Sequence, residues 1–574
     1  MTKLCLKRGK KLIKRISLNK FKFGMYFSME YLLKYGYFDF KYNSKQYRED
    51  YILSNMVFKK VFNTNGLEEL YLSLKDKVKF NSFKETVPIE LSIYKNEGER
   101  RVLKLPNIYS YICLCEHLNN NQDKYIGILG ASNKSLSSEF YSSSFLTSKI
   151  KRENNRIGKR KLFKTDVQNF YPSVYTHSIP WILAGKTEAK RKKRDNKIYY
   201  NALDNLIQRC QIGETHGLPT GSFASKLIAE IYMCKLDEKL NKYDYVRYVD
   251  DFEFPYNDDS EKDLFYKELN KELASLNLKV KVEKNQTDSF PFQDGNNLAF
   301  FFDYFSNGDC VIKTQQKRIY NFIEECIFKE REGYKGSLKL MFQALKDSIS
   351  KDKLDREAYT IPMLNKLFNL VLMQPNLTVN YLEFIDVLNK HDEVRFGINS
   401  IKKEIQNNIS RYIDLVYSQE LYLLFSIFYY LDILTVCPIE QLLEIIIKMD
   451  DLSSTLAFEI LLQDENNIND ELFKPLESKL ENSTSWQEEH WFFKYHIINR
   501  INSDKRKKLY LKYKDYLYKK YANGLKRSIF FNLNKLKKVE SPINHAWQHV
   551  NSDQDISIFF KELLANKVSF VNVR

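Results

Sequence analysis

The chain of 574 residues is too long for one hydrophobic core, so we expect two to four domains. Hydrophobic residues make up 43% of the chain and aromatic residues 14%, which argues against a disordered protein. The net charge of +17 favours a polyanionic partner, most often nucleic acid. A lysine-rich surface that serves only solubility is the alternative.

The N-terminal residues 1–24 are predicted to form a basic arm, because residues 1–22 contain nine Lys and Arg. They lack the continuous apolar segment of a signal peptide. Eight cysteines scattered along the chain suit a reducing compartment, so we expect a cytoplasmic protein. The most apolar stretch, at 421–431, is too short to cross a bilayer, and no membrane association is expected.

Cys113, Cys115 and His117 form a compact C-x-C-x-H cluster. A zinc site usually needs a second pair of ligands, and the sequence offers no matching pair. We therefore interpret the cluster as the core-facing side of a helix, with a zinc site as the less favoured alternative.

The middle of the chain mixes strand-like and helical patterns. A loop rich in Gly and Pro at 215–222 precedes an amphipathic helix at 223–240. Ser222 or Thr220 is the candidate N-cap of this helix. The predicted β-structure consists of strands at 161–171, 276–287 and 297–305 and a hairpin at 245–256. These patterns indicate an α+β domain over residues 25–314.

The composition and hydrophobic pattern of the sequence change after about residue 315, where Gly and Pro become rare and one helical pattern follows another. Helices with short connections indicate an all-α, repeat-like domain over residues 315–574. The expected architecture is a HEAT-like α-solenoid, although the sequence shows no clean repeat period.

The stretch "YVRYVDDFEFPY" at 245–256 places Asp250 and Asp251 side by side within a strand-like run. Strands usually avoid adjacent carboxylates, which repel each other and pack poorly. A divalent cation removes this penalty, and Mg²⁺ prefers carboxylate and phosphate oxygens. Asp166 lies on another strand-like run and supplies a third carboxylate. The three residues therefore predict a site for two ions about 4 Å apart, which suits phosphoryl transfer.

Four segments, in order, resemble the palm of a reverse transcriptase. A strand Asp is followed by an aromatic pair, a Gly-Leu-Pro-Thr-Gly loop opens a helix, Tyr-Val-Asp-Asp lies in a hairpin, and a Lys follows in "EKNQT". In that family these segments are the motifs lettered A to D. The resemblance implies an α+β fingers–palm domain that polymerises DNA with two Mg²⁺, for which Mn²⁺ can substitute.

Position by position, the resemblance implies that Asp166, Asp250 and Asp251 are the metal ligands and catalytic carboxylates. Tyr171 matches the bulky residue that crowds a ribose 2′-OH and favours dNTPs, and Lys284 matches a catalytic lysine near the incoming triphosphate. The loop that shapes the nucleotide floor corresponds to Gly217, Pro219 and Gly221. Basic fingers residues would bind the triphosphate; no motif selects among the candidates, of which we expect Arg160 to be one: Arg152, Arg156, Lys159 and Arg160.

The resemblance narrows to the bacterial abortive-infection reverse transcriptases of the AbiK type. The segments that carry it are "YTHSIPW" (175–181), "CQIGETHGLPTG" (210–221), "RYVDDFEFP" (247–255), "SFPF" (289–292), "KYGYFDF" (34–40) and "LPNIYSY" (105–111). It covers about residues 25–310, whereas the remainder agrees only in length, helicity and composition. The family implies a helical domain in place of the thumb, and a trimer or hexamer. It also implies untemplated addition of dNTPs to a protein hydroxyl, a single-stranded DNA product, and defence against phage.

Protein priming requires a tyrosine that can reach the metal site. In the AbiK-type pattern this tyrosine lies a few residues before a Lys-Val-Phe-Asn-like segment, which is at 60–63 here. The resemblance therefore implies Tyr51 as the priming residue, with Tyr47 second. Packing is the ordinary role of tyrosines in such an aromatic-rich region.

Three other features leave alternatives open. His177 and His216 flank the catalytic segments, and we favour hydrogen-bonding roles over general acid catalysis because neither has a charge partner nearby in sequence. The basic cluster at 190–194 either guides nucleic acid or is a solvated loop. The segment 505–521, rich in Lys and Tyr, either binds a single strand or forms a plain amphipathic helix.

Two functions compete with untemplated, protein-primed synthesis. One is template-directed synthesis of cDNA by the same palm. The other is an oligomeric scaffold that binds nucleic acid without polymerase chemistry. The presence of all three carboxylates favours an enzyme.

Overall fold

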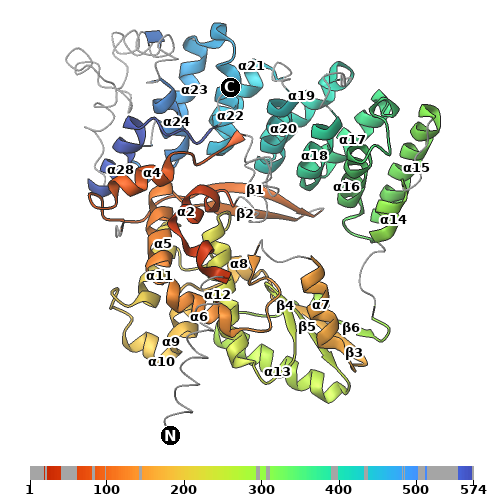
Figure 1. The fold of residues 1–574 in the computed structure, drawn as a ribbon. Coiled ribbons are helices and arrows are strands. Elements are labelled where there is room, and N and C mark those ends of the chain that lie inside the picture. The colour runs from red at the N-terminus through yellow and green to blue at the C-terminus, as the bar shows by residue number, and fades with distance from the viewer. Residues whose placement is uncertain are drawn as a thin grey trace.

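In the computed structural model, a four-stranded sheet and its covering helices lie at one end of the molecule, and an arc of helices lies at the other (Figure 1). A two-stranded hairpin lies between these two parts. The structure describes Asn19, Ser483 and residues 22–39, 61–80, 84–96, 99–140, 145–292, 298–305, 311–388, 398–431, 437–480, 485–501, 511–512 and 554–571.

The four-stranded sheet is antiparallel throughout and has the strand order β4-β5-β3-β6. Its strands are β3 (Lys161–Asp166), β4 (Val246–Tyr248), β5 (Asp251–Tyr256) and β6 (Gln286–Ser289). The hairpin predicted at 245–256 is confirmed as β4 and β5. The strand predicted at 161–171 ends earlier, because the chain turns at Asn169, with φ of 46°, into the short helix α8 (Phe170–Ser173).

Two long helices pack against this sheet. Helix α12 (Phe223–Lys239) confirms the helix predicted at 223–240 and directs two buried acids toward Arg247 of β4. Ser222 occupies the N-cap position of α12, but its side chain makes no capping hydrogen bond. Helix α13 (Asp259–Ser275) stacks the ring of Phe265 on that of Phe254, with centroids 4.3 Å apart.

The remaining elements before residue 292 surround the sheet or extend from it (Figure 1). The N-terminal ones are η1 (Gly24–Phe27), α2 (Met29–Tyr31), η2 (Leu32–Gly36) and α4 (Leu67–Leu74). The hairpin between the two parts of the molecule consists of β1 (Ile89–Asn96) and β2 (Glu99–Leu105). The others are α5 (Ile108–Asn120), α6 (Gln122–Ala131), α7 (Phe145–Arg156), α9 (Ser178–Ala184), α10 (Lys186–Arg191), α11 (Tyr199–Arg209) and η4 (Val282–Lys284).

Two of the predicted strands differ in the structure. The segment 276–287 makes only one bridge to β3's extension, between Val280 and Val167, before it enters η4 and then β6. The segment 297–305 contains a helix, α14 (Leu298–Asp303). Its run of aromatic residues has no clear period, so burial decides the conformation: the Phe305 ring packs 4.9 Å from that of Phe322 in the next helix.

The part of the chain after residue 311 is helical wherever the structure describes regular elements, up to a bridge at Val571. Successive even-numbered helices from α16 to α24 contact one another and form the arc seen in Figure 1. A HEAT-like repeat remains a prediction for this region. The elements are α15 (Ile312–Arg331), α16 (Ser337–Ser350), η5 (Arg356–Ala358), α17 (Ile361–Met373), η6 (Pro375–Leu377), α18 (Thr378–Leu388), α19 (Ile398–Asp414), α20 (Ser418–Leu431), α21 (Ile439–Lys448), α22 (Asp451–Leu461), η8 (Glu465–Asn467), α23 (Asp470–Leu480), α24 (Trp491–Ile501) and α28 (Gln554–Ala565).

The C-terminal helices return to the N-terminal part of the chain. Phe62 bridges Val571, and the Asn63 amide donates a hydrogen bond to the Phe570 carbonyl at 2.9 Å. The buried side chain of Asn107, the N-cap of α5, donates to the Trp486 carbonyl at 2.8 Å. One continuous hydrophobic cluster therefore includes residues on both sides of the predicted boundary at 314/315, and that boundary stays a prediction.

The β1–β2 hairpin is tied to the helical arc through Arg100. Its guanidinium donates two hydrogen bonds of 2.7 Å to the carboxylate of Glu420, which is only 5% exposed. The same guanidinium lies 3.8 Å from the centroid of the Tyr417 ring. A bidentate pair on a largely buried carboxylate is stronger than an ordinary surface ion pair.

We expect Glu420→Ala to lower the free energy of unfolding by about 2 kcal/mol, because Arg100 loses its bidentate partner. Arg100→Ala and the double variant complete a double-mutant cycle, in which we expect a coupling energy of about 1–2 kcal/mol. Urea unfolding measures all four proteins. A coupling energy near zero would contradict a stabilising link between hairpin and arc. Glu444→Ala, which removes an exposed partner of Lys448 on the same arc, is the control and should change stability little.

The proposed zinc alternative is not supported. Cys113 and Cys115 are buried in α5, and His117 pairs its Nε2 with the Tyr125 hydroxyl at 2.9 Å. Burial lowers the pKa of His117 to about 4. Among the residues that the structure describes, all cysteines are free and buried, which confirms the interpretation as helix core. In the same residues, no helix combines the length and apolar character needed to span a bilayer.

Candidate active site

The tip of the β4–β5 hairpin carries Asp250 and Asp251. Val249, just before them, adopts φ of 56°, a left-handed conformation that is strained for a β-branched residue. Two hydrogen bonds hold it there: its amide donates to the Ser137 hydroxyl at 2.9 Å, and its carbonyl accepts from Arg247 at 2.9 Å. The hairpin tip is therefore set by contacts to other elements as well as by its own turn.

The pairing of β3 with β5 brings the third carboxylate to this tip. Asp166 ends β3 directly opposite Asp251, and the Val167 amide donates a hydrogen bond to the Asp250 carbonyl at 3.3 Å. The Asp166 carboxylate lies close enough to Asp250 for its charge to raise the pKa of Asp250. Asp166 thus meets the two adjacent aspartates that lie 84 and 85 positions after it at one end of the sheet.

The electrostatics of this cluster are unfavourable without a cation. Burial, followed by the neighbouring charges of Asp166 and Asp251, raises the pKa of Asp250 to about 7. Burial and the Asp166 charge also raise the pKa of Asp251, against the opposing effect of Lys284. Such a cluster either retains a proton near neutral pH or binds a positive charge.

Lys284 supplies part of that positive charge. Its ammonium forms an ion pair with Asp166 and lies 4.0 Å from the Asp251 carboxylate, and the hydrogen bond to Asp166 raises the pKa of Lys284. The backbone places it there, because the Lys281 amide donates to the Asp166 carbonyl at 2.7 Å just before η4. The side chain remains about half exposed, so it can also contact a phosphate that enters the site.

The chemistry of the cluster fits a divalent cation. Asp166, Asp250 and Asp251 would hold it, because they are hard oxygen donors whose mutual repulsion a dication relieves. In the described part of the chain the three carboxylates are not arranged as a ready group of metal ligands, and Asp166 is ion-paired with Lys284. A bound Mg²⁺ would activate a hydroxyl nucleophile and stabilise a pyrophosphate leaving group.

Tyr171 lies beside the cluster and is held by the glycine-rich loop. The Leu218 amide donates to the Tyr171 carbonyl at 3.0 Å, and the Gly217 amide donates to the Val174 carbonyl at 2.8 Å. Gly217 has φ of 86°, and a Cβ there would lie 3.5 Å from the Pro172 backbone, so the position favours glycine on conformational grounds. Burial, with a contribution from the Asp250 charge, raises the pKa of Tyr171.

The second half of the loop contacts the β1–β2 hairpin. The Lys104 amide on β2 donates to the Thr220 carbonyl at 2.7 Å, and the Ser225 hydroxyl donates to the Pro219 carbonyl at 2.5 Å. Gly221 has φ of 130°, in a conformation that L side chains rarely adopt. The loop thus joins the hairpin to the start of α12 and lies next to the predicted nucleotide floor.

The basic candidates separate into two groups. Arg160 precedes β3, whose opposite end carries Asp166, so the structure does not bring Arg160 to the carboxylates. An extended strand of six residues puts about 20 Å between the two positions. The assignment of Arg160 to the nucleotide site is therefore corrected. Lys159, the residue before it, lies at the same end of the sheet, away from the carboxylates.

Arg152 and Arg156 on α7 both bind Glu253, at 2.8 and 2.6 Å. Glu253 lies two residues after Asp251 on β5, and the Arg152 charge acts to lower the pKa of Asp251. Among the basic candidates for triphosphate binding, Arg152 is thus a residue whose charge affects one of the carboxylates, Asp251.

Two groups near the site were not predicted from the sequence. Lys226, one turn into α12, forms an ion pair with Asp39, and both charges affect the pKa of Tyr171. Arg247 is fully buried and donates to Glu230 and Asp237 of α12. The arginine of "RYVDD" was visible in the sequence as a charge within a strand, which signals a buried partner. Nothing in the sequence connects Asp39 with Lys226.

His177 has a charge partner that sequence proximity does not show. Its Nδ1 lies 2.6 Å from Asp204 of α11, and this contact raises the pKa of His177. The ring of Tyr175 contacts His177 and also His216, at centroid distances of 5.0 and 5.3 Å. Both histidines therefore make structural contacts. Tyr51, Tyr47 and most of the arm at 1–24 and of the segment 505–521 lie outside the described residues.

Because Asp250 has a raised pKa, its charged form destabilises the metal-free protein. The penalty is absent below pH ~4, where aspartate is protonated in the unfolded chain, and is complete above pH ~7. At about pH 8 without metal, we expect Asp250→Asn to raise the free energy of unfolding by about 2 kcal/mol, and the gain to shrink toward pH ~5. Mg²⁺ should raise the unfolding midpoint of the wild type but not that of Asp250→Asn.

Thermal and urea unfolding with and without Mg²⁺ measure both effects. Asp263→Asn, at an exposed position of α13, is the matched control and should change neither stability nor the response to Mg²⁺. If Asp250→Asn destabilised the metal-free protein above about pH 7, the repulsion inferred among the carboxylates would be wrong.

A family model described as "Reverse transcriptase (RNA-dependent DNA polymerase)" matches residues 113–320. Among solved structures, apo telomerase from Candida tropicalis is 14% identical, covering 63% of this chain and 74% of that one at a TM-score of 0.32. Telomerase from Candida albicans, in complex with the TWJ fragment of telomeric RNA, is 13% identical, covering 62% and 69% at a TM-score of 0.28. No curated protein in the comparison matches the chain.

The matched residues contain all four strands of the sheet, the three aspartates, Lys284 and the glycine-rich loop. The family match and the geometry thus concern the same part of the chain, in which the motifs converge at one end of the sheet. Residues 113–320 form a reverse transcriptase domain, with the fingers–palm fold of a nucleotidyltransferase.

Proposed function

We propose that this protein is an Mg²⁺-dependent DNA polymerase whose chemistry takes place at Asp166, Asp250 and Asp251. The observation that carries the proposal is the convergence of these carboxylates at the end of β3 and β5, with Lys284 against them. Lys284 neutralises the cluster and contacts the triphosphate of an incoming dNTP. Tyr171, held by the glycine loop beside Asp250, limits the space at the ribose and selects dNTPs.

The finer proposal is that synthesis is untemplated, begins on a tyrosine hydroxyl, and serves abortive infection against phage in the cytoplasm. Its support is the sequence resemblance to the AbiK type over about residues 25–310. The same resemblance supports assembly into a trimer or hexamer and a single-stranded DNA product attached to Tyr51. The net charge of +17 is compatible with retention of such a product.

Nuclease-treated protein, incubated with one dNTP at a time and Mg²⁺ but no template, tests this proposal. We expect untemplated addition and, by mass spectrometry, an oligodeoxynucleotide attached to Tyr51. Tyr51→Phe should abolish the attachment, because it lacks the nucleophilic hydroxyl, whereas Tyr47→Phe is the matched control and should retain it. Attachment that survives Tyr51→Phe would contradict this priming residue, and absence of any attached DNA would contradict protein priming.

Template-directed synthesis is the second candidate, favoured by the family description of an RNA-dependent DNA polymerase. It shares the carboxylates and differs only in the need for a template. In the same assay, a strict requirement for added RNA or DNA template would support it and contradict untemplated synthesis.

A binding scaffold without chemistry is the third candidate, and the basic composition is its support. The test compares phage resistance of cells that produce the double variant Asp250→Asn/Asp251→Asn with that of cells that produce the wild type. Expression and oligomeric state of the two proteins are compared in parallel. Retained protection would favour the scaffold, whereas lost protection with unchanged assembly would favour the enzyme.

A further inference from the structure

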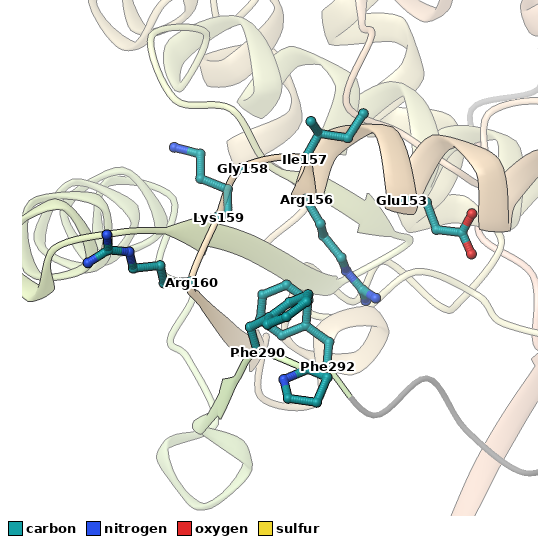
Figure 2. A pocket seen from close by; sticks show the side chains of 9 residues that line it. Glu153, Arg156, Ile157, Gly158, Lys159, Arg160, Phe290 and Phe292 are labelled. Atoms are coloured by element: carbon teal, nitrogen blue, oxygen red, sulfur yellow. The ribbon is translucent and has the colours of Figure 1, made fainter.

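A shallow cavity of about 580 Å³ lies at the end of the sheet away from the aspartates. It is formed where α7 ends, where β3 begins, and where the chain turns after β6, and Figure 2 shows its side chains. The lining residues are Glu153, Arg156, Ile157, Gly158, Lys159, Arg160, Phe290, Pro291 and Phe292. The site thus combines basic and aromatic side chains.

The backbone around this cavity is well anchored. The Phe290 amide donates to the Arg160 carbonyl at 2.9 Å, which continues the β3–β6 pairing by one residue. The Arg160 amide donates to the Asn257 side chain at 3.0 Å, and the Lys159 amide donates to the Arg156 carbonyl at 3.1 Å. The aromatic and basic side chains are therefore presented from fixed positions on the palm.

The two aromatic rings have different surroundings. Phe292 packs edge-on against Phe290 at 5.9 Å, and the Arg156 guanidinium lies 5.7 Å from its centroid while binding Glu253. Phe290 itself is 72% exposed, the greatest exposure of any described phenylalanine that is not buried in the core. An exposed aromatic ring held at a fixed position beside basic side chains is the combination that single-stranded nucleic acid binds.

The charges beside Phe290 are available to a ligand. In the described part of the chain, neither Lys159 nor Arg160 has an ion pair or a side-chain hydrogen bond. Glu153 on the rim is 3.7 Å from Lys149, so its charge is partly offset. Lys159 and Arg160 thus line the same cavity as the ring with their charges uncompensated, and Figure 2 shows their side chains pointing outward, away from Phe290 and Phe292.

We propose that this cavity binds single-stranded nucleic acid, with a base stacked on Phe290 and phosphates on Lys159 and Arg160. Bases stack on any exposed aromatic face, and basic side chains beside it bind the backbone without sequence preference. The site is about 20 Å from the carboxylates along β3, so it does not hold the incoming nucleotide. It lies beyond the catalytic proposal and does not depend on it.

The test measures binding of a fluorescein-labelled oligothymidylate of about 12 nucleotides to nuclease-treated full-length protein. EDTA and the absence of dNTPs keep the assay independent of polymerase activity. We expect Phe290→Ala to weaken binding about tenfold, and Phe290→Trp to retain it, since one stacked base is lost only in the first. The double variant Lys159→Ala/Arg160→Ala should make the negative slope of log K against log salt less steep by about 1.4, which corresponds to the loss of two phosphate contacts.

Matched controls are Phe328→Ala and Lys335→Ala/Lys339→Ala on α15, α16 and their connection, which remove a phenylalanine and two positive charges at exposed positions of the helical arc. They should change neither the affinity nor the salt slope. Equal losses in test and control variants, or unchanged values in the test variants, would overturn the proposal. Binding of a labelled polyglutamate that depends on Lys159, Arg160 and Phe290, with oligothymidylate binding unaffected, would also overturn it in favour of an acidic peptide.

Discussion

Replacing Asp250 and Asp251 with asparagine is expected to reduce nucleotidyl transfer at least about a thousandfold, which corresponds to roughly 4 kcal/mol of activation free energy. Asparagine keeps the size of the side chain but removes the negative charge that a divalent cation requires. Both residues lie at the hairpin tip opposite Asp166, so the double change leaves one carboxylate of the cluster, and that one is paired with Lys284.

Single-turnover assays with saturating dNTP and Mg²⁺ measure this loss for each single variant and for the double variant. Asp263→Asn is the control, because it makes the same change on the exposed side of α13 in the same domain. The expected stability gain of Asp250→Asn separates a chemical defect from misfolding. Activity within tenfold of the wild type in the double variant would contradict a catalytic role for the hairpin.

Replacing Arg247 with alanine is expected to lower the free energy of unfolding by about 3–5 kcal/mol, more than any other substitution proposed for this protein. The guanidinium is 0% exposed and binds Glu230 and Asp237 at 2.9 Å. Burial acts to raise the pKa of Glu230, but Arg247 and two serine hydroxyls lower it overall, so Glu230 is charged at neutral pH. Removal of Arg247 would leave two buried carboxylates without their cation.

The same change should also disturb the β4–β5 hairpin that carries Asp250 and Asp251, because Arg247 donates to the carbonyl of the strained residue Val249. Urea unfolding gives the stability loss. Arg191→Ala removes an exposed arginine from its pair with Glu188 and serves as the control, with an expected loss below about 1 kcal/mol.

The triple variant Arg247→Met/Glu230→Gln/Asp237→Asn removes the arginine and its two buried carboxylate partners together. It should recover much of the stability, because the large loss in Arg247→Ala comes from uncompensated carboxylates. It should recover less of the polymerase activity, since methionine cannot donate to Val249. A stability loss for Arg247→Ala no greater than that of Arg191→Ala would contradict the inferred charge network.

Local pattern was sufficient for the elements that carry the motifs. The helix at 223–240 and the hairpin at 245–256 are both present, although α12 is buried on nearly all sides instead of being amphipathic as predicted. The order of the motifs predicted that Asp166 and the two hairpin aspartates belong together, and the β3–β5 pairing places them at one end of the sheet. The position of Arg160 could also have been found from the sequence, because it lies six positions before Asp166 along an extended strand.

Local pattern failed where packing chooses between conformations. The aromatic run at 297–305 fits a buried strand and a buried helix equally well, and it forms α14 against Phe322 of α15. The segment 276–287 has strand-like alternation, but most of it connects α13 with β6 and positions Lys284 through η4. In both places the partner surface, rather than the segment itself, determines the backbone.

The sequence by itself determined the candidate site of this protein: the three carboxylates, the glycines of the loop and the lysine that follows, since each residue type suits the ligand or conformation expected of it. Only the tertiary structure decided what holds that chemistry in place. Arg247 forms ion pairs with two acidic residues of α12, and Lys226 forms one with Asp39. Arg100 of the β1–β2 hairpin forms one with Glu420 of the helical arc. These partners are up to 320 residues apart. Charges at such separations meet only through the packing of other elements, which a local pattern does not encode.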